Sequence, residues 1–428
     1  MSKKESRPGF GKILEAWVAP DEAGEPVGCV ATSFTFSPAF FEEECLSRFL
    51  HLDTDPNEDG ASYLVEREEK LAQVVCAAAL VDQHHCKGNR NLRWDLFSPR
   101  LSSGILHAKI ALLHWAQLVR VIISSANITE DGYRRNQEVF GVLDYRPGGE
   151  APLNCLAQTV EFLREIARYS RIGSESAPAA LTRWEIFLDK VAGIPQEWGM
   201  GQEQYDRNAV RIHPLFVGPG RANAFETLSE NWPGGGPPND ARIVSPFFDP
   251  PANNNGPAER LWENLRRRGE AHVSFFVSAE EIPGEEGLFV HAPESLRSVQ
   301  PTGRPNVSTE FFRVDLEANR SLHAKGVWLA NDRWISYMIG SSNFTSAGLG
   351  LSQNPNLEAN LVYIVDFTRN RKAYNLLEKS FPSGYPIDPK CPLKWQPCPD
   401  TGEDAPGDDL PLPRTFGSAT YDCDEKQK

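Results

Sequence analysis

Two sets of polar residues, each a histidine, a lysine and an asparagine, are the part of this 428-residue chain that could do chemistry. The first set is His107, Lys109 and Asn127, and the second is His323, Lys325 and Asn343. In both sets the lysine follows the histidine by two residues and the asparagine follows it by twenty. An imidazole can move a proton, while an ammonium group and an amide can bind an oxyanion. One set predicts an anion-binding corner, and two sets facing each other predict a catalytic site.

Both sets begin in a stretch with strand character. Residues two apart point to the same face of a strand, so we expect each histidine and its lysine to project together. A second apolar run follows each pair, over residues 119–123 and 334–339, and ends in a serine-rich turn before the asparagine. The Ser, Asn and Thr residues after it predict a helix start, where free backbone N–H groups favour an anion.

The repetition extends beyond these six residues. Thr129 and Thr345 follow each asparagine by two, and the segment 136–138, Asn-Gln-Glu, resembles 356–358, Asn-Leu-Glu. A lone histidine on a strand is most often structural. Recurrence of the same types in the same order favours a duplicated unit whose halves share one site.

The composition indicates a globular protein: 40% of the residues are hydrophobic and 24% are charged. The net charge of −14 argues against a broad nucleic-acid-binding surface, although it permits a local basic groove. No secretory signal and no apolar run long enough to span a membrane are visible. The eight cysteines lack framework spacing, which predicts free thiols and a cytoplasmic location.

We expect five segments along the chain. They are an N-terminal segment (1–27), a first lobe (28–201), a crossing between lobes (202–240), a second lobe (241–390) and a Pro- and Asp-rich tail (391–428). A Ser-Pro pair precedes the histidine in each lobe, with Pro38 69 residues before His107 and Pro246 77 residues before His323. Within the first lobe the pattern predicts a strand over 33–38 and a helix over 64–80.

The paired His-x-Lys and Asn motifs resemble the phospholipase D superfamily. The usual pattern has an Asp seven residues after the histidine, but this chain has His114 and Ala330 there. The second copy, 340–343, keeps the Gly-Ser-x-Asn pattern, whereas the first, 124–127, reads Ser-Ser-Ala-Asn. Copies without the Asp are more similar to the tyrosyl-DNA phosphodiesterase branch. The resemblance implies an α/β fold of two pseudo-twofold-related lobes, each a mixed β-sheet flanked by helices.

The resemblance also implies a mechanism. His107 would attack phosphorus to form a phosphohistidine, and His323 would act as general acid and base. The two lysines and two asparagines would bind the phosphate oxygens, so that no metal or cofactor is expected. Glu138 and Glu358 are candidates to orient the imidazoles, and which Glu serves which His stays open. Expected substrate-binding residues are Ser125, Ser342, Arg134 and Arg135.

Three classes of function remain open. The preferred one is cleavage of a nucleic acid, DNA in particular, by a nuclease or a 3′-end-processing enzyme, with repair or defence as its setting. A protein partner could supply DNA affinity to this acidic chain. The second class is a phospholipase, for which an amphipathic or polybasic membrane surface would be expected. The third is a non-catalytic binding or scaffold protein, which two complete motif sets disfavour.

Overall fold

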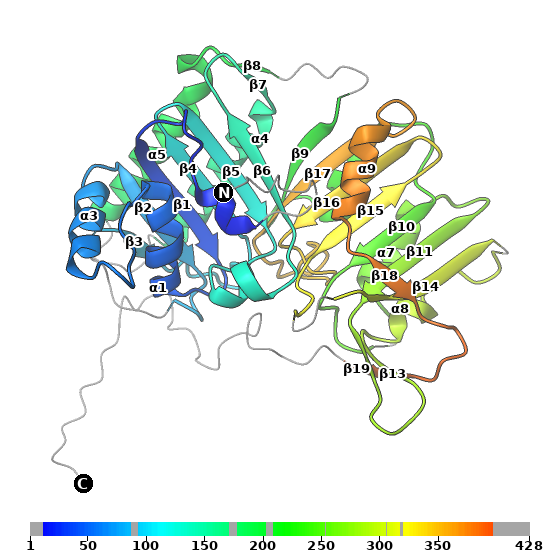
Figure 1. Ribbon diagram of the computed structural model, residues 1–428. Coiled ribbons are helices and arrows are strands. Elements are labelled where there is room, and N and C mark those ends of the chain that lie inside the picture. The colour runs from blue at the N-terminus through cyan, green and yellow to red at the C-terminus, as the bar shows by residue number, and fades with distance from the viewer. Residues whose placement is uncertain are drawn as a thin grey trace, which may run out of the picture.

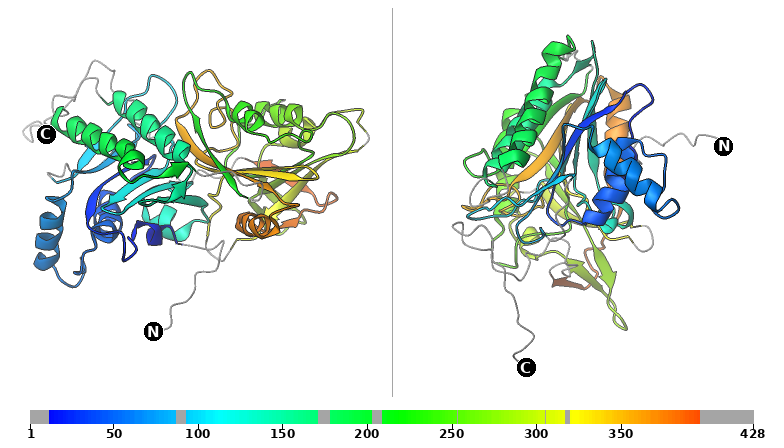
Figure 2. Two further views of the ribbon diagram at one scale, coloured as in Figure 1. Left: turned by 90° about the horizontal axis from the view of Figure 1, so that it is seen from above. Right: turned by 90° about the vertical axis from the view of Figure 1, so that its left-hand side faces the viewer.

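Two mixed β-sheets stand side by side in the computed structural model, each with helices on both faces (Figures 1 and 2). The structure describes residues 12–86, 93–170, 178–202, 209–252, 254–304, 306–316 and 320–396. The predicted fold class, two α/β lobes, is confirmed. We call the sheet built from residues 26–145 and its helices the first lobe, and the sheet built from residues 211–386 and its helices the second lobe.

The first sheet has the strand order β3-β2-β1-β4-β5-β6. Its strands are β1 (Pro26–Ser33), β2 (Cys76–Val81), β3 (Asp95–Phe97), β4 (Ile110–Trp115), β5 (Leu118–Ser124) and β6 (Phe140–Tyr145). The pairs β1–β2 and β2–β3 are parallel, while β1–β4, β4–β5 and β5–β6 are antiparallel.

The second sheet contains the same arrangement with one strand added at each edge. Its order is β18-β14-β11-β10-β15-β16-β17-β9. The strands are β9 (Arg211–Val217), β10 (Asp240–Val244), β11 (Ala271–Val277), β14 (Val307–Val314), β15 (Gly326–Ala330), β16 (Trp334–Gly340), β17 (Glu358–Asp366) and β18 (Gly384–Pro386). The core β14-β11-β10-β15-β16-β17 repeats the parallel and antiparallel pairings of the first sheet. The duplication inferred from the motifs therefore extends to the whole sheet.

Helices cover both faces of each sheet. In the first lobe α4 (Leu153–Arg168) and α5 (Pro178–Glu197) cover one face. The other face packs against η1 (Ile13–Trp17), α1 (Pro38–Phe40), the π-turn η2 (Phe41–Leu46) and α2 (Ser47–Leu50), with α3 (Ala61–Leu71) outside them. Alternate residues of β1 point to opposite faces of the sheet. Val30 packs in the core beneath α4 and α5, and Ala31 packs in the core on the other face. In the second lobe α6 (Ala224–Glu230) and α7 (Gly256–Asn264) cover one face and α9 (Arg371–Ser380) the other.

Smaller elements complete the chain. Strands β12 (Ala279–Glu281), β13 (Leu288–His291) and β19 (Leu393–Gln396) form a three-stranded sheet beside α8 (Ser295–Ser298), and β7 (Glu150–Ala151) pairs with β8 (Gly201–Gln202). None of the helices in the described ranges is both long and apolar enough to cross a membrane.

Several expected elements differ from the structure. The expected helix over 64–80 is divided, because α3 ends at Leu71 and residues 76–81 form β2. That alanine-rich run is fully buried between two neighbouring strands, and burial in a parallel sheet overrides its helix propensity. The expected strand over 33–38 is also displaced, since β1 ends at Ser33 and Ser37 caps α1.

The three expected segments outside the lobes all contain residues of the sheets or the core. Residues 202–240 contain α6 and also β9, which pairs with β17 at the edge of the second sheet. Of the expected tail, residues 391–396 are described, and β19 pairs there with β13; residues 397–428 lie outside the described residues. In the N-terminal segment, η1 contributes Ile13, Leu14 and Trp17 to the core.

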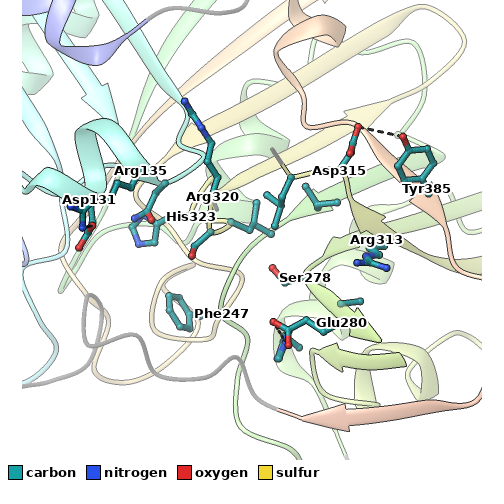
Figure 3. Close-up of a pocket in the computed structure, with 17 residues that line it drawn as sticks. Asp131, Arg135, Phe247, Ser278, Glu280, Arg313, Asp315, Arg320, His323 and Tyr385 are labelled. Carbon is teal, nitrogen blue, oxygen red and sulfur yellow. Dashed lines mark hydrogen bonds and ion pairs between the residues drawn. The ribbon is translucent and has the colours of Figure 1, made fainter. Parts of the chain in front are cut away.

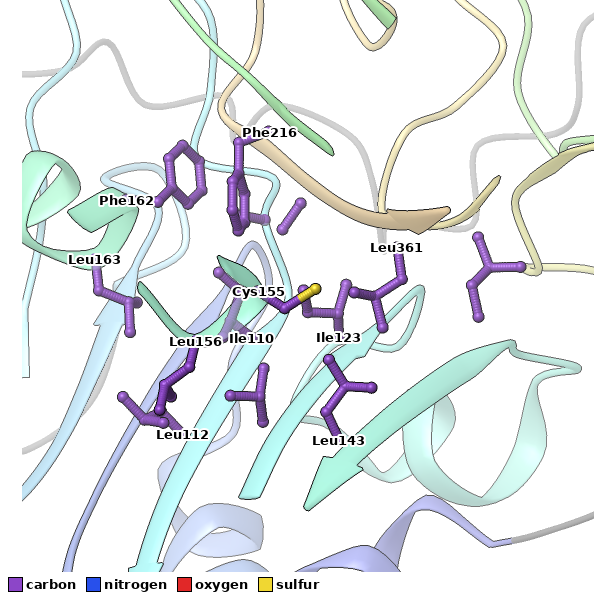
Figure 4. Packing of buried hydrophobic residues seen from close by; sticks show 14 of the residues in the cluster. Ile110, Leu112, Ile123, Leu143, Cys155, Leu156, Phe162, Leu163, Phe216 and Leu361 are labelled. Atoms are coloured by element: carbon purple, nitrogen blue, oxygen red, sulfur yellow. The ribbon is translucent and has the colours of Figure 1, made fainter. Parts of the chain in front are cut away.

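One hydrophobic core extends from the first lobe into the second. Strands β5 and β6 contact β16 and β17 across the seam between the lobes. Figure 4 shows Ile123 and Leu143 of the first sheet beside Leu361 of the second, with Cys155 of α4 next to them. Gly141 of β6 allows this approach, because a Cβ there would lie 2.3 Å from Tyr363 Oη and 2.7 Å from Leu361 Cδ1.

We therefore expect Gly141→Ala to lower the free energy of unfolding by about 1–3 kcal/mol, the usual cost of overpacking. Adding Tyr363→Phe, which removes the closest atom, should recover part of this loss. Gly193→Ala is the control, since a Cβ at that position of α5 meets nothing within 4 Å. Urea denaturation of the four proteins measures these differences. Equal stability of Gly141→Ala and wild type would show that the lobes do not approach each other this closely.

Candidate active site

The structure pairs each histidine with a glutamate of the opposite lobe. His107 Nδ1 lies 2.8 Å and 3.0 Å from the two carboxylate oxygens of Glu358. His323 Nδ1 lies 2.7 Å from Glu138 Oε1. This exchange of partners between the lobes shows which glutamate contacts which histidine, a question that the sequence left open.

Each carboxylate is held by two further groups of its own lobe. Glu358 accepts hydrogen bonds from Ser341 Oγ at 2.5 Å and from Asn356 Nδ2 at 3.1 Å. Glu138 accepts from Ser125 Oγ and, at 3.5 Å, from Asn136 Nδ2. Since these residues recur at matching places in the two copies, the whole hydrogen-bonded unit is duplicated.

Backbone hydrogen bonds hold the two motifs in register across the seam. His107 N donates to Leu357 O at 3.0 Å, and His323 N donates to Gln137 O at 3.0 Å. In return, Leu357 N donates to Ile105 O and Gln137 N donates to Ser321 O. Each His-x-Lys segment therefore forms a short parallel bridge with the Asn-x-Glu segment of the other lobe, ahead of β4 and β15 themselves.

The pKa of the Glu138 carboxyl is lowered from its ordinary value. Burial acts to raise it, but the charge and hydrogen bond of His323, the charge of Lys325 and the hydrogen bond of Ser125 outweigh that effect. Glu138 is therefore ionised at neutral pH. A carboxylate at Nδ1 holds the proton on that nitrogen, so the lone pair of the neutral imidazole lies on Nε2.

The lysines and asparagines of both sets are buried. Lys325 Nζ lies 2.8 Å from His323 Nε2 and 2.9 Å from His323 O. Lys109 Nζ lies 5.9 Å from the centroid of the Phe34 ring, which also contacts the His107 ring edge-on at 5.5 Å. The lysine and the histidine of each set therefore lie in the same environment, as the two-residue spacing predicted.

The two asparagines differ in their hydrogen bonds. Asn127 Oδ1 accepts from Phe34 N at 3.3 Å. In the second lobe the residue equivalent to Phe34 is Pro246. The equivalence follows from the serine that precedes each of them, since Ser33 and Ser245 make matching hydrogen bonds. Proline has no N–H to donate. Asn343 Oδ1 is accordingly buried without a hydrogen-bond partner among the described residues.

A shared turn follows each asparagine. Thr129 Oγ1 accepts from Gly132 N, and Thr345 Oγ1 accepts from Gly348 N, both at 3.0 Å. A Cβ at either glycine would come within 2.6 Å of the asparagine carbonyl oxygen, so the repeat requires Asn-x-Thr-x-x-Gly. The expected helix start is a single π-turn in the first lobe, η3 (Asp131–Arg135), and a turn in the second.

A cavity of about 840 Å³ opens at the seam beside His323 (Figure 3). Arg135 and Asn136 of the first lobe line it together with Arg313 and Arg320 of the second. Carboxylates are interspersed among these arginines, namely Asp131, Glu280 and Asp315. The cavity therefore offers separated charges of both signs next to one of the two imidazoles.

The residues expected to bind substrate have different positions. Arg135 lines the seam cavity, but Arg134 turns away, forms ion pairs with Glu44 and Glu130, and lines another cavity. Ser125 binds Glu138, whereas Ser342 exchanges hydrogen bonds with Asn360.

Two residues at the site were missed by the sequence reasoning. The counterpart of Ser125 is Ser341, which binds Glu358, and the equal two-residue distance to Asn127 and Asn343 was a signal for it. Asp82, at the end of β2, accepts from Leu106 N at 2.7 Å and so anchors the first His-x-Lys segment. No spacing in the sequence pointed to Asp82.

His114, which stands where the usual pattern has an Asp, belongs to the core. It is 1% exposed, and its ring contacts Phe187 and Trp198. Burial, with the charge of Lys190, lowers its pKa to about 4. His114 is therefore a neutral packing residue at neutral pH.

The comparisons with known proteins come from solved structures. No protein-family model matches the chain, and no curated protein matches it either. Yeast tyrosyl-DNA phosphodiesterase is similar over 83% of this chain and 85% of its own, with 10% identity and a TM-score of 0.49.

Two further solved structures are more distant in shape. Phosphatidylserine synthase of Haemophilus influenzae matches over 86% of this chain and 82% of its own (13% identity, TM-score 0.44). Polyphosphate kinase of Porphyromonas gingivalis matches over 86% and 47% (11% identity, TM-score 0.37).

Proposed function

We propose that this protein is a metal-independent phosphodiesterase that cleaves nucleic acid through a phosphohistidine. The observation that carries the proposal is the exchange of buried carboxylates between the lobes, with His107 on Glu358 and His323 on Glu138. A buried imidazole with a carboxylate at Nδ1 is held in one tautomer and presents Nε2 for chemistry. Two such imidazoles meet the needs of a two-step displacement once Lys325 Nζ, which lies 2.8 Å from His323 Nε2, binds the phosphate oxygens instead.

In the first step, His107 Nε2 attacks phosphorus, a P–N bond forms and the bond to the leaving oxygen breaks. The leaving oxygen takes a proton from the protonated His323. In the second step, His323 takes a proton from water, the water oxygen attacks phosphorus and the P–N bond breaks. Lys109 and Lys325, with Asn127 and Asn343, offset the charge on the phosphate oxygens, which is the role a metal has elsewhere.

The seam cavity supports a substrate with more than one phosphate. Arg135, Arg313 and Arg320 line it next to His323, so phosphates beside the scissile one would meet guanidinium groups. A scaffold role would not require both buried pairs to be complete. Processing of DNA ends in repair, or degradation of foreign DNA, would fit this activity.

Substrate class and metal requirement can be tested in one panel. The protein, in buffer with EDTA, is incubated with single-stranded DNA, duplex DNA, a 3′-phosphotyrosyl oligonucleotide and phosphatidylcholine vesicles. We expect product from at least one nucleic acid and none from the lipid. Release of choline alone would favour a phospholipase, and activity that appears only when Mg²⁺ replaces EDTA would contradict charge compensation by the lysines.

The proposed roles of the two histidines predict different catalytic defects in their alanine variants. His107→Ala should abolish turnover and leave no adduct, whereas His323→Ala should accumulate a covalent adduct because the water step lacks its base. Denaturing gels after reaction with an end-labelled substrate measure the adduct. His213→Ala is the control, since this histidine lies on β9, outside both motifs. Labelling of His107→Ala to the wild-type level would refute the nucleophile assignment.

The carboxylates should act on separate steps. Glu358→Gln, next to His107, should slow adduct formation by about 10²-fold or more, and Glu138→Gln should slow leaving-group protonation and adduct hydrolysis. Because ionised Glu138 favours protonated His323, its removal should move the alkaline limb of kcat/KM to lower pH. Rapid-quench kinetics and pH profiles measure these effects.

The matched control is Glu165→Gln, at a partly buried glutamate that binds Arg221 instead of a histidine. Equal losses in all three variants would indicate a general loss of structure in place of step-specific roles.

A further inference from the structure

A small cavity of about 150 Å³ adjoins the seam cavity in the second lobe. We call it the proline pocket, and the described residues that line it are Phe247, Phe248, Asp249, Pro250, Pro251, His291, Ala292 and Pro293. Phe247 and His291 also line the seam cavity, so the two cavities meet at these side chains. Ordinary ligand pockets begin at roughly 300 Å³. The proline pocket is therefore of a size for one ring system and not for a whole nucleotide.

The walls of the proline pocket are mainly apolar and held in place. Apart from Asp249 and His291, every described residue that lines it is apolar. The ring of Phe248 packs edge-on against that of Phe344, with centroids 6.2 Å apart. The Asp249 carboxylate accepts hydrogen bonds from Ser346 N at 2.9 Å and from Ser346 Oγ at 2.6 Å. Because these walls are positioned before a ligand arrives, little conformational entropy is lost on binding.

The described part of the first lobe does not repeat this pocket. Phe36 and Phe248 are equivalent, since each forms a bridge with the residue that follows the motif asparagine. The residue equivalent to Phe247 is therefore Thr35, which has no ring. The segment 291–293 begins at the end of β13, and none of the first-lobe strands in the described ranges lies between β2 and β3, where its counterpart would be. The proline pocket thus belongs to the lobe of His323.

Phe247 stands next to His323 (Figure 3). Their ring centroids lie 6.5 Å apart, with the rings edge-on. His323 lines the seam cavity, but it is not among the described residues that line the proline pocket. In the proposed mechanism His323 protonates the leaving oxygen, so the part of the substrate beside Phe247 is the leaving group.

The separation of the proline pocket from His323 favours one kind of leaving group. A ring held in this pocket needs a spacer between itself and the leaving oxygen. In a nucleotide the sugar is such a spacer, whereas a tyrosyl ring carries the leaving oxygen directly. The geometry therefore fits a nucleobase better than a tyrosyl ring.

We propose that Phe247 and the proline pocket bind the nucleobase of the leaving nucleotide. This inference rests on the proposed function and deepens it, because it makes the scissile bond one that joins two nucleotides. Every base has a π-face, so an aromatic side chain binds bases with little sequence preference. Phe247 would supply that face, and the prolines would supply apolar contacts around the ring.

Binding without cleavage is the first test. Fluorescence anisotropy is measured with the His107→Ala protein and two labelled single strands of equal length and charge, one with bases and one with abasic tetrahydrofuran residues. Adding Phe247→Ala should raise the Kd of the base-bearing strand about tenfold, a usual loss for a stacking aromatic, and leave that of the abasic strand unchanged. Because the phosphates are the same in both strands, their contribution cancels in the comparison.

Cleavage of dinucleotides, each with a single phosphodiester, is the second test. One position at a time is made abasic. We expect removal of the leaving base to lower kcat/KM about tenfold in the wild type and to have no effect in Phe247→Ala. Phe247→Tyr keeps the ring face and should retain the wild-type preference, whereas Phe247→Leu keeps an apolar side chain without a ring face and should lose it.

The matched control is Phe36→Ala, which removes a partly exposed phenylalanine ring from the first lobe. A general loss of stability lowers binding of both strands and cleavage of all dinucleotides together, so the preference for a base should stay at the wild-type value in this variant. Thermal melts show whether each variant is folded.

An unchanged preference for bases in Phe247→Ala, or an equal loss of preference in Phe36→Ala, would overturn the inference. It would also be overturned if Phe247→Ala slowed tyrosine release from a 3′-phosphotyrosyl oligonucleotide while the preference for bases stayed the same. If the wild type cleaved no nucleic acid but the binding preference still depended on Phe247, the proposed function would fail and the base-binding role of Phe247 would hold.

Discussion

The rest of this structure depends on two buried histidine–glutamate hydrogen bonds whose partners belong to different lobes. His107, Glu358 and His323 are each no more than 3% exposed. Leaving such a carboxylate without its imidazole would cost several kcal/mol, because a buried charge needs a partner. The lobes are therefore held together at the place where the chemistry is proposed, and the shared core around Leu361 and Gly141 supports the same contact.

The two lobes contain matching sets of site residues, but the surroundings of the two sets differ in a few residues. Phe34 provides an N–H to Asn127, whereas Pro246 cannot provide one to Asn343. The seam cavity opens beside His323, whose Nε2 is already bound by Lys325. A two-step displacement needs one imidazole as nucleophile and the other as acid, so unequal surroundings suit the proposed chemistry.

The charge distribution is also uneven. The chain carries a net charge of −14, yet arginines gather in the seam cavity. At the seam the arginines are interspersed with the carboxylates of Asp131, Glu280 and Asp315, so groups of both signs line that cavity. Local fields of this kind, and not the net charge, decide where an anion binds.

The sequence by itself determined the parts of the protein that depend on short spacings. Two-residue periodicity placed each lysine beside its histidine, and the repeat of Asn, Thr and Glu predicted a duplicated unit. The tertiary structure decided which groups meet: His107 and Glu358 are 251 residues apart, and His323 and Glu138 are 185 apart. It also placed Ser341 at the site, turned Arg134 away and made residues 76–81 a strand. These outcomes depend on how sheets pack and lobes dock, and local propensity carries no information about contacts over such separations.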